Sequence, residues 1–303
     1  MPDNAHFADI FNYYIYDGRQ VIKPEDLEEK DAVEETIIKK IDSIVSSQKI
    51  RDVLKGVAIK SNKDATFAIL GIENQSEIHY AMPVKCMIYD ALNYSAQVSS
   101  RAKELKNSKN KISDAEYLSG FSKNDKLTPV ITLVINWSDK EWDGPIRLSD
   151  MFDDMNPDIM NVVEDYGIKL IDPYQITDFN KFHTMLGDVL ELIKSQNEED
   201  CFEKMLKKKG SDWKLDIDSI NMINTYTGAQ ISTDGVKENV MEMCRAAASL
   251  VEKGMEKGTN TINKLNLILI DSGRIDDLTK ASKDPDYQKK LIAELIPEDN
   301  NKT

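Results

Sequence analysis

The sequence predicts a mixed α/β domain followed by an all-α region. The first observation is Leu127–Trp137, a β-branched apolar run between polar turns, which is typical of a central strand. The second is the order of patterns up to that run: helix, strand, strand, strand, helix, strand. The third is that beyond residue 198 we find helical spacing and no strong strand pattern. We therefore expect one domain over residues 1–197 and a helical region over 198–303.

The N-terminal patterns predict one helix and a hairpin. Asn4–Tyr16 carries apolar residues at helical spacing. Val33–Ile38 is a candidate short strand. Asp52–Lys60 and Thr66–Ile72 are dense in Val, Ile and Leu, and the residues between them, Ser61–Asp64, favour a turn. A short turn between two strands predicts an antiparallel hairpin.

The remaining helices follow from apolar periodicity. Pro83 suits the first turn of a helix, and the pattern continues from Val84 to about Leu105. Phe179–Ser195 predicts an amphipathic helix. The C-terminal region predicts five more: Asp218–Thr227, Gly235–Lys257, Thr261–Ile270, Arg274–Ala281 and Pro285–Leu295.

Composition narrows the class of protein. The chain has 303 residues, 41% of them hydrophobic, and a net charge of −14, which argues against a protein that coats nucleic acid non-specifically. No apolar stretch approaches the roughly 20 residues of a membrane span, and we see no secretory signal. The scattered cysteines and histidines make a zinc site improbable. We therefore expect a cytoplasmic protein with reduced thiols and no membrane partner.

The charge is unevenly distributed. Arg101–Lys111 carries five basic residues and one acidic residue, and basic residues gather again in Lys204–Lys214. Such a run is more often a solvated face, and contact with phosphate is the alternative. Both interpretations remain open on the sequence alone.

Two carboxylates fall at the same end of the predicted hairpin. If the turn centres near Lys63, Asp52 lies eleven positions before it and Glu73 lies ten after it. Opposed strand positions bring Cβ atoms to about 4.5–5.5 Å, and like charges that close favour a cation between them. Gln75 would share the face of Glu73, and the Asn74 carbonyl could add an oxygen. These donors predict a Mg²⁺ or Mn²⁺ site.

Four stretches carry a resemblance to a known family: HFADIFNYYIYDG, IRDVLKG, LGIENQSEIHYAMPVK and LTPVITLVINW. They resemble the recombination-promoting nuclease/putative transposase family over residues 4–195. The element order, with Asp at the start of the second strand and Glu-x-Gln at the end of the third, resembles the PD-(D/E)xK phosphodiesterase superfamily. The resemblance implies a restriction-endonuclease-like core, a mixed central sheet flanked by helices.

The resemblance also implies a function and site residues. The activity would be metal-dependent cleavage of double-stranded DNA, linked to recombination, transposition or defence against phage. Asp52 and Glu73 match the metal-ligand carboxylates, and Gln75 occupies the position that holds Lys in the superfamily. Gln carries no charge, so a neighbouring cation such as Lys85 would have to supply it. A homodimer would suit double-strand cleavage.

Two other classes of function remain open. The first is a nuclease-fold protein that binds DNA or regulates without cutting it, which the Gln75 departure favours. The second is a protein–protein module whose helical tail is the working part.

Several polar residues near the predicted site have two interpretations. His79 is a candidate general base or an ordinary loop histidine. Tyr89, Asn93 and Gln97 either steady the site or form a plain polar stripe on their helix. Asp9 is a candidate acid facing the site. The tryptophans around the end of the central strand, Trp137 and Trp142, are expected to pack rather than to stack on bases.

Overall fold

The computed structural model describes residues 3–29, 57–59, 68–107, 113–153, 156–198, 200–233, 236 and 239–296. The chain divides by its contacts into two compact units. The first comprises Met1–Cys201 and Asp218–Ala229, and the second comprises Phe202–Ile217 and Gln230–Thr303. The first unit thus includes a stretch from beyond residue 197. The predicted domain boundary between residues 197 and 198 remains a prediction.

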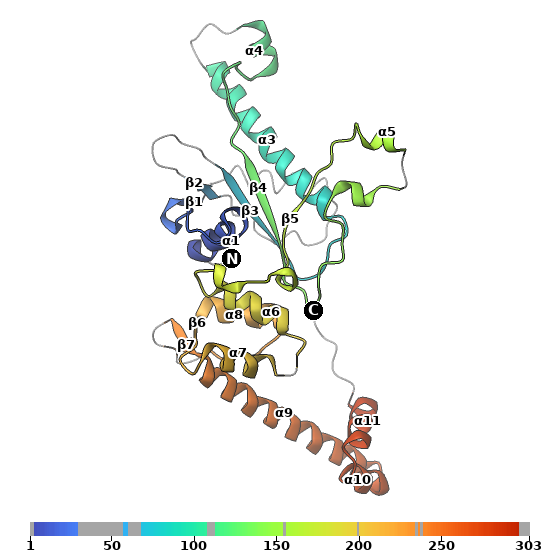
Figure 1. The fold of residues 1–303 in the computed structure, drawn as a ribbon. Coiled ribbons are helices and arrows are strands. Elements are labelled where there is room, and N and C mark those ends of the chain that lie inside the picture. Colours follow the sequence, from blue (N-terminus) through green and yellow to red (C-terminus); the bar gives the residue numbers. More distant parts are fainter. Residues whose placement is uncertain are drawn as a thin grey trace. The chain divides into compact units, whose positions relative to one another are not determined.

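A five-stranded sheet forms the centre of the first unit (Figure 1). Its order follows the chain: β1 (Leu27–Glu29), β2 (Val57–Ile59), β3 (Ile69–Gln75), β4 (Val130–Asn136) and β5 (Lys169–Ile171). The first three strands pair antiparallel, and β3, β4 and β5 pair parallel. The predicted mixed α/β class is therefore confirmed for this unit.

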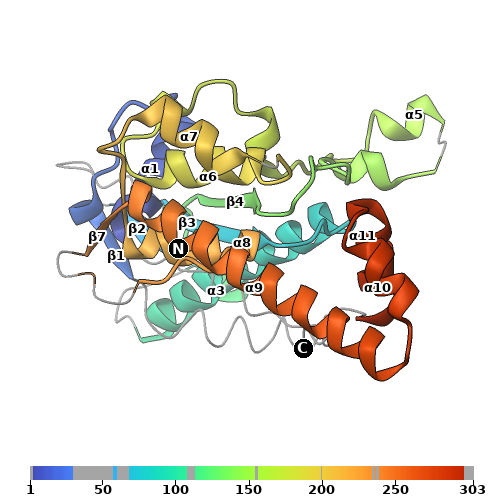
Figure 2. The ribbon, with the colours of Figure 1, turned by 90° about the horizontal axis from the view of Figure 1, so that it is seen from below.

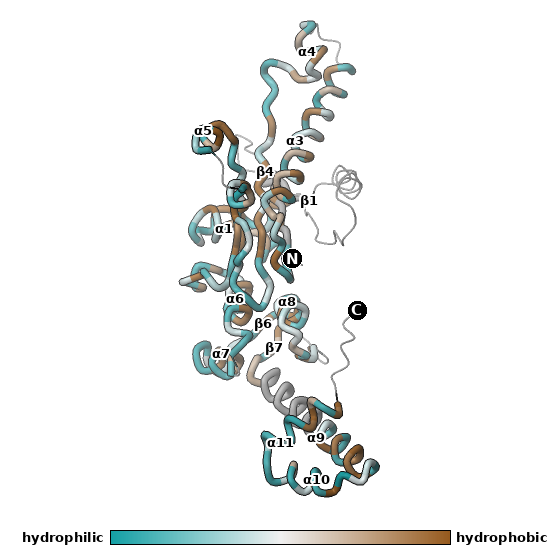
Figure 3. The backbone as a smooth tube through the Cα atoms, turned by 90° about the vertical axis from the view of Figure 1, so that its right-hand side faces the viewer, coloured by the Kyte–Doolittle hydropathy of each residue, from teal (hydrophilic) through white to brown (hydrophobic). Residues whose placement is uncertain are grey.

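Helices cover both faces of this sheet. Figures 2 and 3 show α1 (Asn4–Tyr16) and α6 (Leu186–Ser195) on one face and α3 (Met82–Asn107) on the other. The central strand β4 lies between these layers, and six of its seven residues are buried. Burial on both faces explains why β4 is apolar along nearly its whole length. The shorter helical segments of this unit are η1 (Pro24–Asp26), α4 (Asp114–Ser119), η2 (Leu148–Met151), α5 (Pro157–Met160), η3 (Pro173–Gln175), η4 (Phe179–Lys181) and α8 (Ile217–Thr227).

The first helix has the bounds that the sequence predicts, because both of its ends are capped locally. The Asp3 carboxylate accepts a hydrogen bond from the His6 N–H at 2.7 Å, which satisfies a donor of the first turn. Asp17 ends the helix in the left-handed conformation, with φ of 55°. The buried face of α1 carries Phe7, Ile10 and Phe11.

The hairpin register differs from the prediction by one residue. A turn centred at Lys63 would place Val57 opposite Ile69, whereas the structure pairs Val57 with Leu70 and Ala58 with Ile69. The turn itself and the predicted strand at 33–38 lie outside the described residues. The first strand of the sheet is β1, which precedes that stretch.

The predicted helix Phe179–Ser195 is wrong over its first seven residues. Residues 179–181 form the short η4, and α6 begins only at Leu186. The N–H groups of His183 and Thr184 donate to the Asp9 carboxylate of α1 instead of to helix carbonyls. Tertiary hydrogen bonds therefore override the local helical pattern here.

The second unit contains a sheet, so the prediction of an all-α C-terminal region is wrong. β6 (Lys214–Asp216) and β7 (Val240–Glu242) pair antiparallel. Each strand has three residues, too few for an alternating pattern to show in the sequence. The helices of this unit are α7 (Cys201–Lys209), α9 (Met243–Asp271), α10 (Ile275–Ala281) and α11 (Pro285–Leu295). α9 is one helix where the sequence predicts two.

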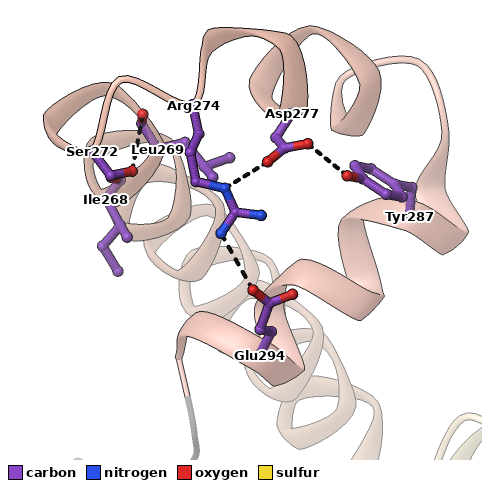
Figure 4. Close-up of polar contacts among 7 residues, drawn as sticks. All are labelled: Ile268, Leu269, Ser272, Arg274, Asp277, Tyr287 and Glu294. Carbon is purple, nitrogen blue, oxygen red and sulfur yellow. Dashed lines mark hydrogen bonds and ion pairs between the residues drawn. The ribbon is translucent and has the colours of Figure 1, made fainter.

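The last three helices share a small core of Leu265, Leu269, Ala281 and Leu291. Beside this core, a polar cluster joins α10 to α11 (Figure 4). Arg274 donates from Nε to Asp277 at 2.5 Å and from Nη1 to Glu294 at 3.3 Å, and the Tyr287 hydroxyl donates to Asp277 at 2.6 Å. Among the helices described, none combines the length and apolar character that crossing a membrane requires.

Candidate functional site

The polar triplet Glu73-Asn74-Gln75 lies inside the sheet. β3 continues past its last apolar residue, Ile72, and ends at Gln75. In the parallel ladder with β4, Glu73 pairs with Val134 and Gln75 with Asn136. The triplet thus occupies the carboxyl end of a strand that pairs parallel with the central strand. In open α/β sheets this edge is where ligands commonly bind.

Gln75 is a buried strand residue, 7% exposed, and not a plain turn residue. Its Nε2 donates to the Asn74 carbonyl oxygen at 3.0 Å. Trp137, the residue after β4, donates its backbone N–H to the Gln75 carbonyl at 2.7 Å and its indole N–H to Asn74 Oδ1 at 2.8 Å. Trp137 therefore fixes the end of β3 through two hydrogen bonds, and its expected packing role is confirmed by its 1% exposure.

The neighbouring strands also end in buried polar residues, Asn136 on β4 and Asp172 after β5. Asn136 Nδ2 donates to Asp172 Oδ1 at 3.3 Å, and Asn136 Oδ1 accepts from the Ser138 hydroxyl at 2.6 Å. Asp172 Oδ2 accepts the N–H of Trp142, itself buried, at 2.9 Å. Neither residue is among the candidates found from the sequence, although each lies at the end of an apolar strand pattern. Their hydrogen bonds hold the loops at this edge.

The two predicted metal-binding carboxylates are not brought together within the described part of the structure. Asp52 lies outside the described residues, and so does the side chain of Glu73, whose backbone pairs with Val134. Their facing arrangement stays a prediction. Among the described residues, no group of three or more His, Cys, Asp or Glu side chains is arranged to hold a metal ion. The Asn74 carbonyl is the one proposed metal ligand that the structure describes.

Lys85 and His79 lie at the start of α3, just after the triplet in the chain. The Ala81 N–H donates to His79 Nδ1 at 3.2 Å, and the Met82 N–H donates to the His79 carbonyl at 3.0 Å. Partial burial lowers the pKa of His79, and the nearby charge of Lys85 lowers it further. His79 therefore shapes the turn into α3. Lys85 Nζ lies 5.9 Å from the centroid of the Tyr89 ring.

The polar stripe on α3 forms hydrogen bonds that support the local structure. Gln97 donates to the Thr128 carbonyl at 3.0 Å and accepts the Thr128 N–H at 2.7 Å. Asn93 Nδ2 donates to the carbonyl of Tyr89 at 3.2 Å, and both residues are buried. These contacts favour the interpretation of an ordinary structural stripe. Asp9 is likewise engaged in structure, since it accepts hydrogen bonds from the loop before α6.

Residues 35–212 match the family model described as "Putative transposase, YhgA-like". The chain belongs to this family. The matched stretch is more than half of the chain and contains Asp52, Glu73, Gln75 and Lys85. This confirms the family resemblance seen in the sequence, and the PD-(D/E)xK superfamily is consistent with it. No curated protein and no solved structure matches the chain. Membership of the YhgA-like family indicates a nuclease- or transposition-related role and an interaction with DNA.

Proposed function

We propose that this chain is a metal-dependent DNA endonuclease with a restriction-endonuclease-like core. The observation that carries the proposal is Glu73-Asn74-Gln75 at the carboxyl end of β3, at the point where the sheet changes from antiparallel to parallel pairing. Among the described elements, the order up to β4 is helix, strand, strand, strand, helix, strand, apart from the short η1 and α4, and this order supports it. So does the YhgA-like family, whose description names transposases.

The proposed metal ligands are Asp52, Glu73 and the carbonyl of Asn74. All three are hard oxygen donors, which suits Mg²⁺ or Mn²⁺ and does not suit a thiophilic ion. The Asn74 carbonyl already accepts the Gln75 amide, but a carbonyl has two lone pairs and can take a second partner. The donor chemistry therefore fits a hard cation.

Each residue then has a distinct task in hydrolysis. A bound Mg²⁺ supplies charge neutralisation at the scissile phosphate and a water of lowered pKa. Asp52 and Glu73 hold the cation, and Gln75 orients the water or the phosphate by hydrogen bonding. Gln75 has no charge, so Lys85 supplies the positive charge that stabilises the transition state. The proposed substrate is double-stranded DNA.

Nicking of supercoiled plasmid in Mg²⁺, Mn²⁺, Ca²⁺ or EDTA tests this function. We expect cleavage in Mg²⁺ or Mn²⁺, its loss in EDTA, and a decrease of more than about 100-fold for Asp52→Ala and for Glu73→Ala, because a lost ligand weakens metal binding at least as much as a lost supporting residue. Glu77→Ala is the matched control, since Glu77 is an exposed carboxylate in the next loop. Circular dichroism confirms that each variant is folded. Cutting by both variants at the wild-type rate would refute the site.

A second candidate function is a nuclease-fold protein that binds DNA without cutting it. The observation in its favour is the hydrogen bond from Gln75 Nε2 to the Asn74 carbonyl, because it engages the amide nitrogen with the backbone and not with a water or a phosphate. This candidate predicts DNA binding by the wild type with no nicking in any of the metals. The plasmid experiment therefore separates the two functions.

A further inference from the structure

The outer part of α3 projects past the sheet. The last buried residue of α3 is Asn93, and Gln97 is bound to Thr128, two residues before β4 begins. The helix continues for ten residues beyond Gln97, to Asn107, which is about 15 Å of helix. With α4 and the segment that returns to β4, this part forms what we call the α3–α4 arm, of which the structure describes residues 98–107 and 113–126 (Figures 1 and 3).

Local contacts, and not a hydrophobic core, order the arm. Gly120 ends α4 in the left-handed conformation and approaches α3 so closely that a Cβ there would lie 2.7 Å from the Ala102 Cβ. The Glu116 carboxylate accepts hydrogen bonds from Ser113, Ser122 and Lys123, and these bonds lower its pKa to about 2. Because these local contacts hold the arm in place without a hydrophobic core, its side chains are available to contact a partner.

The arm is basic in an acidic chain. Residues 101–126 contain seven Lys or Arg and four Asp or Glu, whereas the whole chain has a net charge of −14. Glu104 is paired with Arg101 at 2.7 Å, so that both charges are balanced locally. In the described part of the arm four lysines are exposed, and none of them forms an ion pair with a described residue: Lys103, Lys106, Lys123 and Lys126.

We propose that the α3–α4 arm binds the phosphate backbone of duplex DNA. The inference rests on the proposed function, which makes DNA the substrate. An acidic chain repels a polyanion over most of its surface, so a locally basic arm is a place where the duplex can approach. The separation is also suitable: Lys85 and Lys106 are 21 residues apart on α3, or about 32 Å, close to the 34–36 Å of one turn of B-DNA. A duplex that runs along α3 with one phosphate near Lys85 would therefore reach the arm about one turn away.

Fluorescence anisotropy with a labelled duplex of about two helical turns tests the arm. The assay is run in EDTA and in Ca²⁺ over a series of salt concentrations. The arm variant replaces all four lysines by Ala, which retains the helix because Ala has the highest helix propensity. The matched control removes the same charge from exposed positions of the second unit: Lys264→Ala, Lys283→Ala, Lys289→Ala and Lys290→Ala.

We expect the arm variant to bind at least about tenfold more weakly, with a salt slope of log K reduced by up to about 3.6, because each lost phosphate contact removes about 0.9. The control should bind within about twofold of the wild type. Equal affinity and equal slope for the arm variant, or no binding by the wild type, would overturn the proposal. So would arm-dependent binding to phosphatidylserine vesicles with DNA binding unchanged, because that would assign the arm to a membrane surface.

The two proposals fail in different ways. Binding of DNA that depends on the arm, without any nicking of plasmid, would refute the nuclease and support the arm. Metal-dependent nicking by the wild type together with wild-type affinity of the arm variant would refute the arm alone.

Discussion

A single buried carboxylate joins distant parts of the first unit. Asp9 on α1 is 1% exposed and accepts hydrogen bonds from the N–H groups of His183 and Thr184, at 2.8–3.0 Å. It also accepts from the Thr184 hydroxyl at 2.7 Å. These donors lie 174 and 175 positions away in the chain. Asp9 therefore links α1, the first helix of this unit, to the loop before α6.

Replacing this carboxylate should be costly. Asp9→Ala removes the acceptor of these three donors and of Gln20 Nε2, which donates to Asp9 at 3.3 Å, so we expect a loss of about 3 kcal/mol or more in the free energy of unfolding. Urea denaturation followed by circular dichroism measures it. The control is Asp17→Asn, because Asp17 forms an exposed ion pair with Lys181 and Asn tolerates its left-handed backbone. That variant should lose less than about 1 kcal/mol. Equal losses for the two variants would contradict the role of Asp9.

The structural roles of Asp9 and Gln75 could not be predicted from residue type alone. In the sequence Asp9 is an acid on a helix, and nothing local indicates that its donors lie near residue 183. Gln75 has the spacing of a site residue, but its burial and its hydrogen bond to the Asn74 carbonyl depend on the ladder with β4. Candidate residues could thus be found from spacing and family likeness, whereas their partners could not.

At the scale of elements, one side-chain amide of α3 fixes the segment that leads into the central strand. Gln97 bonds both the N–H and the carbonyl of Thr128, at 2.7 and 3.0 Å, just before β4 begins. The Gln97 amide thus pairs with the two backbone groups of Thr128, as a neighbouring strand would. Beyond this point α3 has no buried residue, so Gln97 is where the α3–α4 arm starts.

Removing this amide should loosen the base of the arm. Gln97→Ala leaves both backbone groups of Thr128 without their partner, and we expect a loss of about 1–2 kcal/mol in the free energy of unfolding. Ser99→Ala on the same helix is the control, because Ser99 is exposed and Ala favours helix, and it should change stability by less than about 0.5 kcal/mol. Thermal and urea unfolding measure both variants. A wild-type midpoint for Gln97→Ala would show that water replaces the amide at no cost.

Elements with local end signals could be predicted, and those that depend on partners could not. Asp3 caps α1, and Pro285 opens α11 after the capping residue Asp284, so both helices have the predicted bounds. Strands of three residues, such as β6, are too short to show an alternating pattern. The single helix α9 passes through Gly254 and Gly258, because each glycine costs a helix only about 1 kcal/mol.

At the scale of the whole molecule, each of the two units has a core of its own. The first unit buries the two sides of β4, and one of its clusters comprises Met82, Cys86, Val134 and Trp142. The second unit buries Leu265, Leu269, Ala281 and Leu291 between its last three helices. A small core supplies little stability, so the α9–α11 core should open more readily than the sheet.

A single core substitution can show whether the two units open separately. Leu291 is 2% exposed, and Leu291→Ala should cost about 2–5 kcal/mol within the α9–α11 core. Hydrogen exchange measured by mass spectrometry should then show loss of protection in α9–α11 with protection in β3 and β4 unchanged. Leu267→Ala is the matched control, because Leu267 on α9 is 60% exposed and its truncation leaves no cavity. If β3 and β4 lose protection to the same extent as α9–α11, the chain unfolds as one cooperative body. The two compact units would then differ in their internal contacts but would not unfold independently.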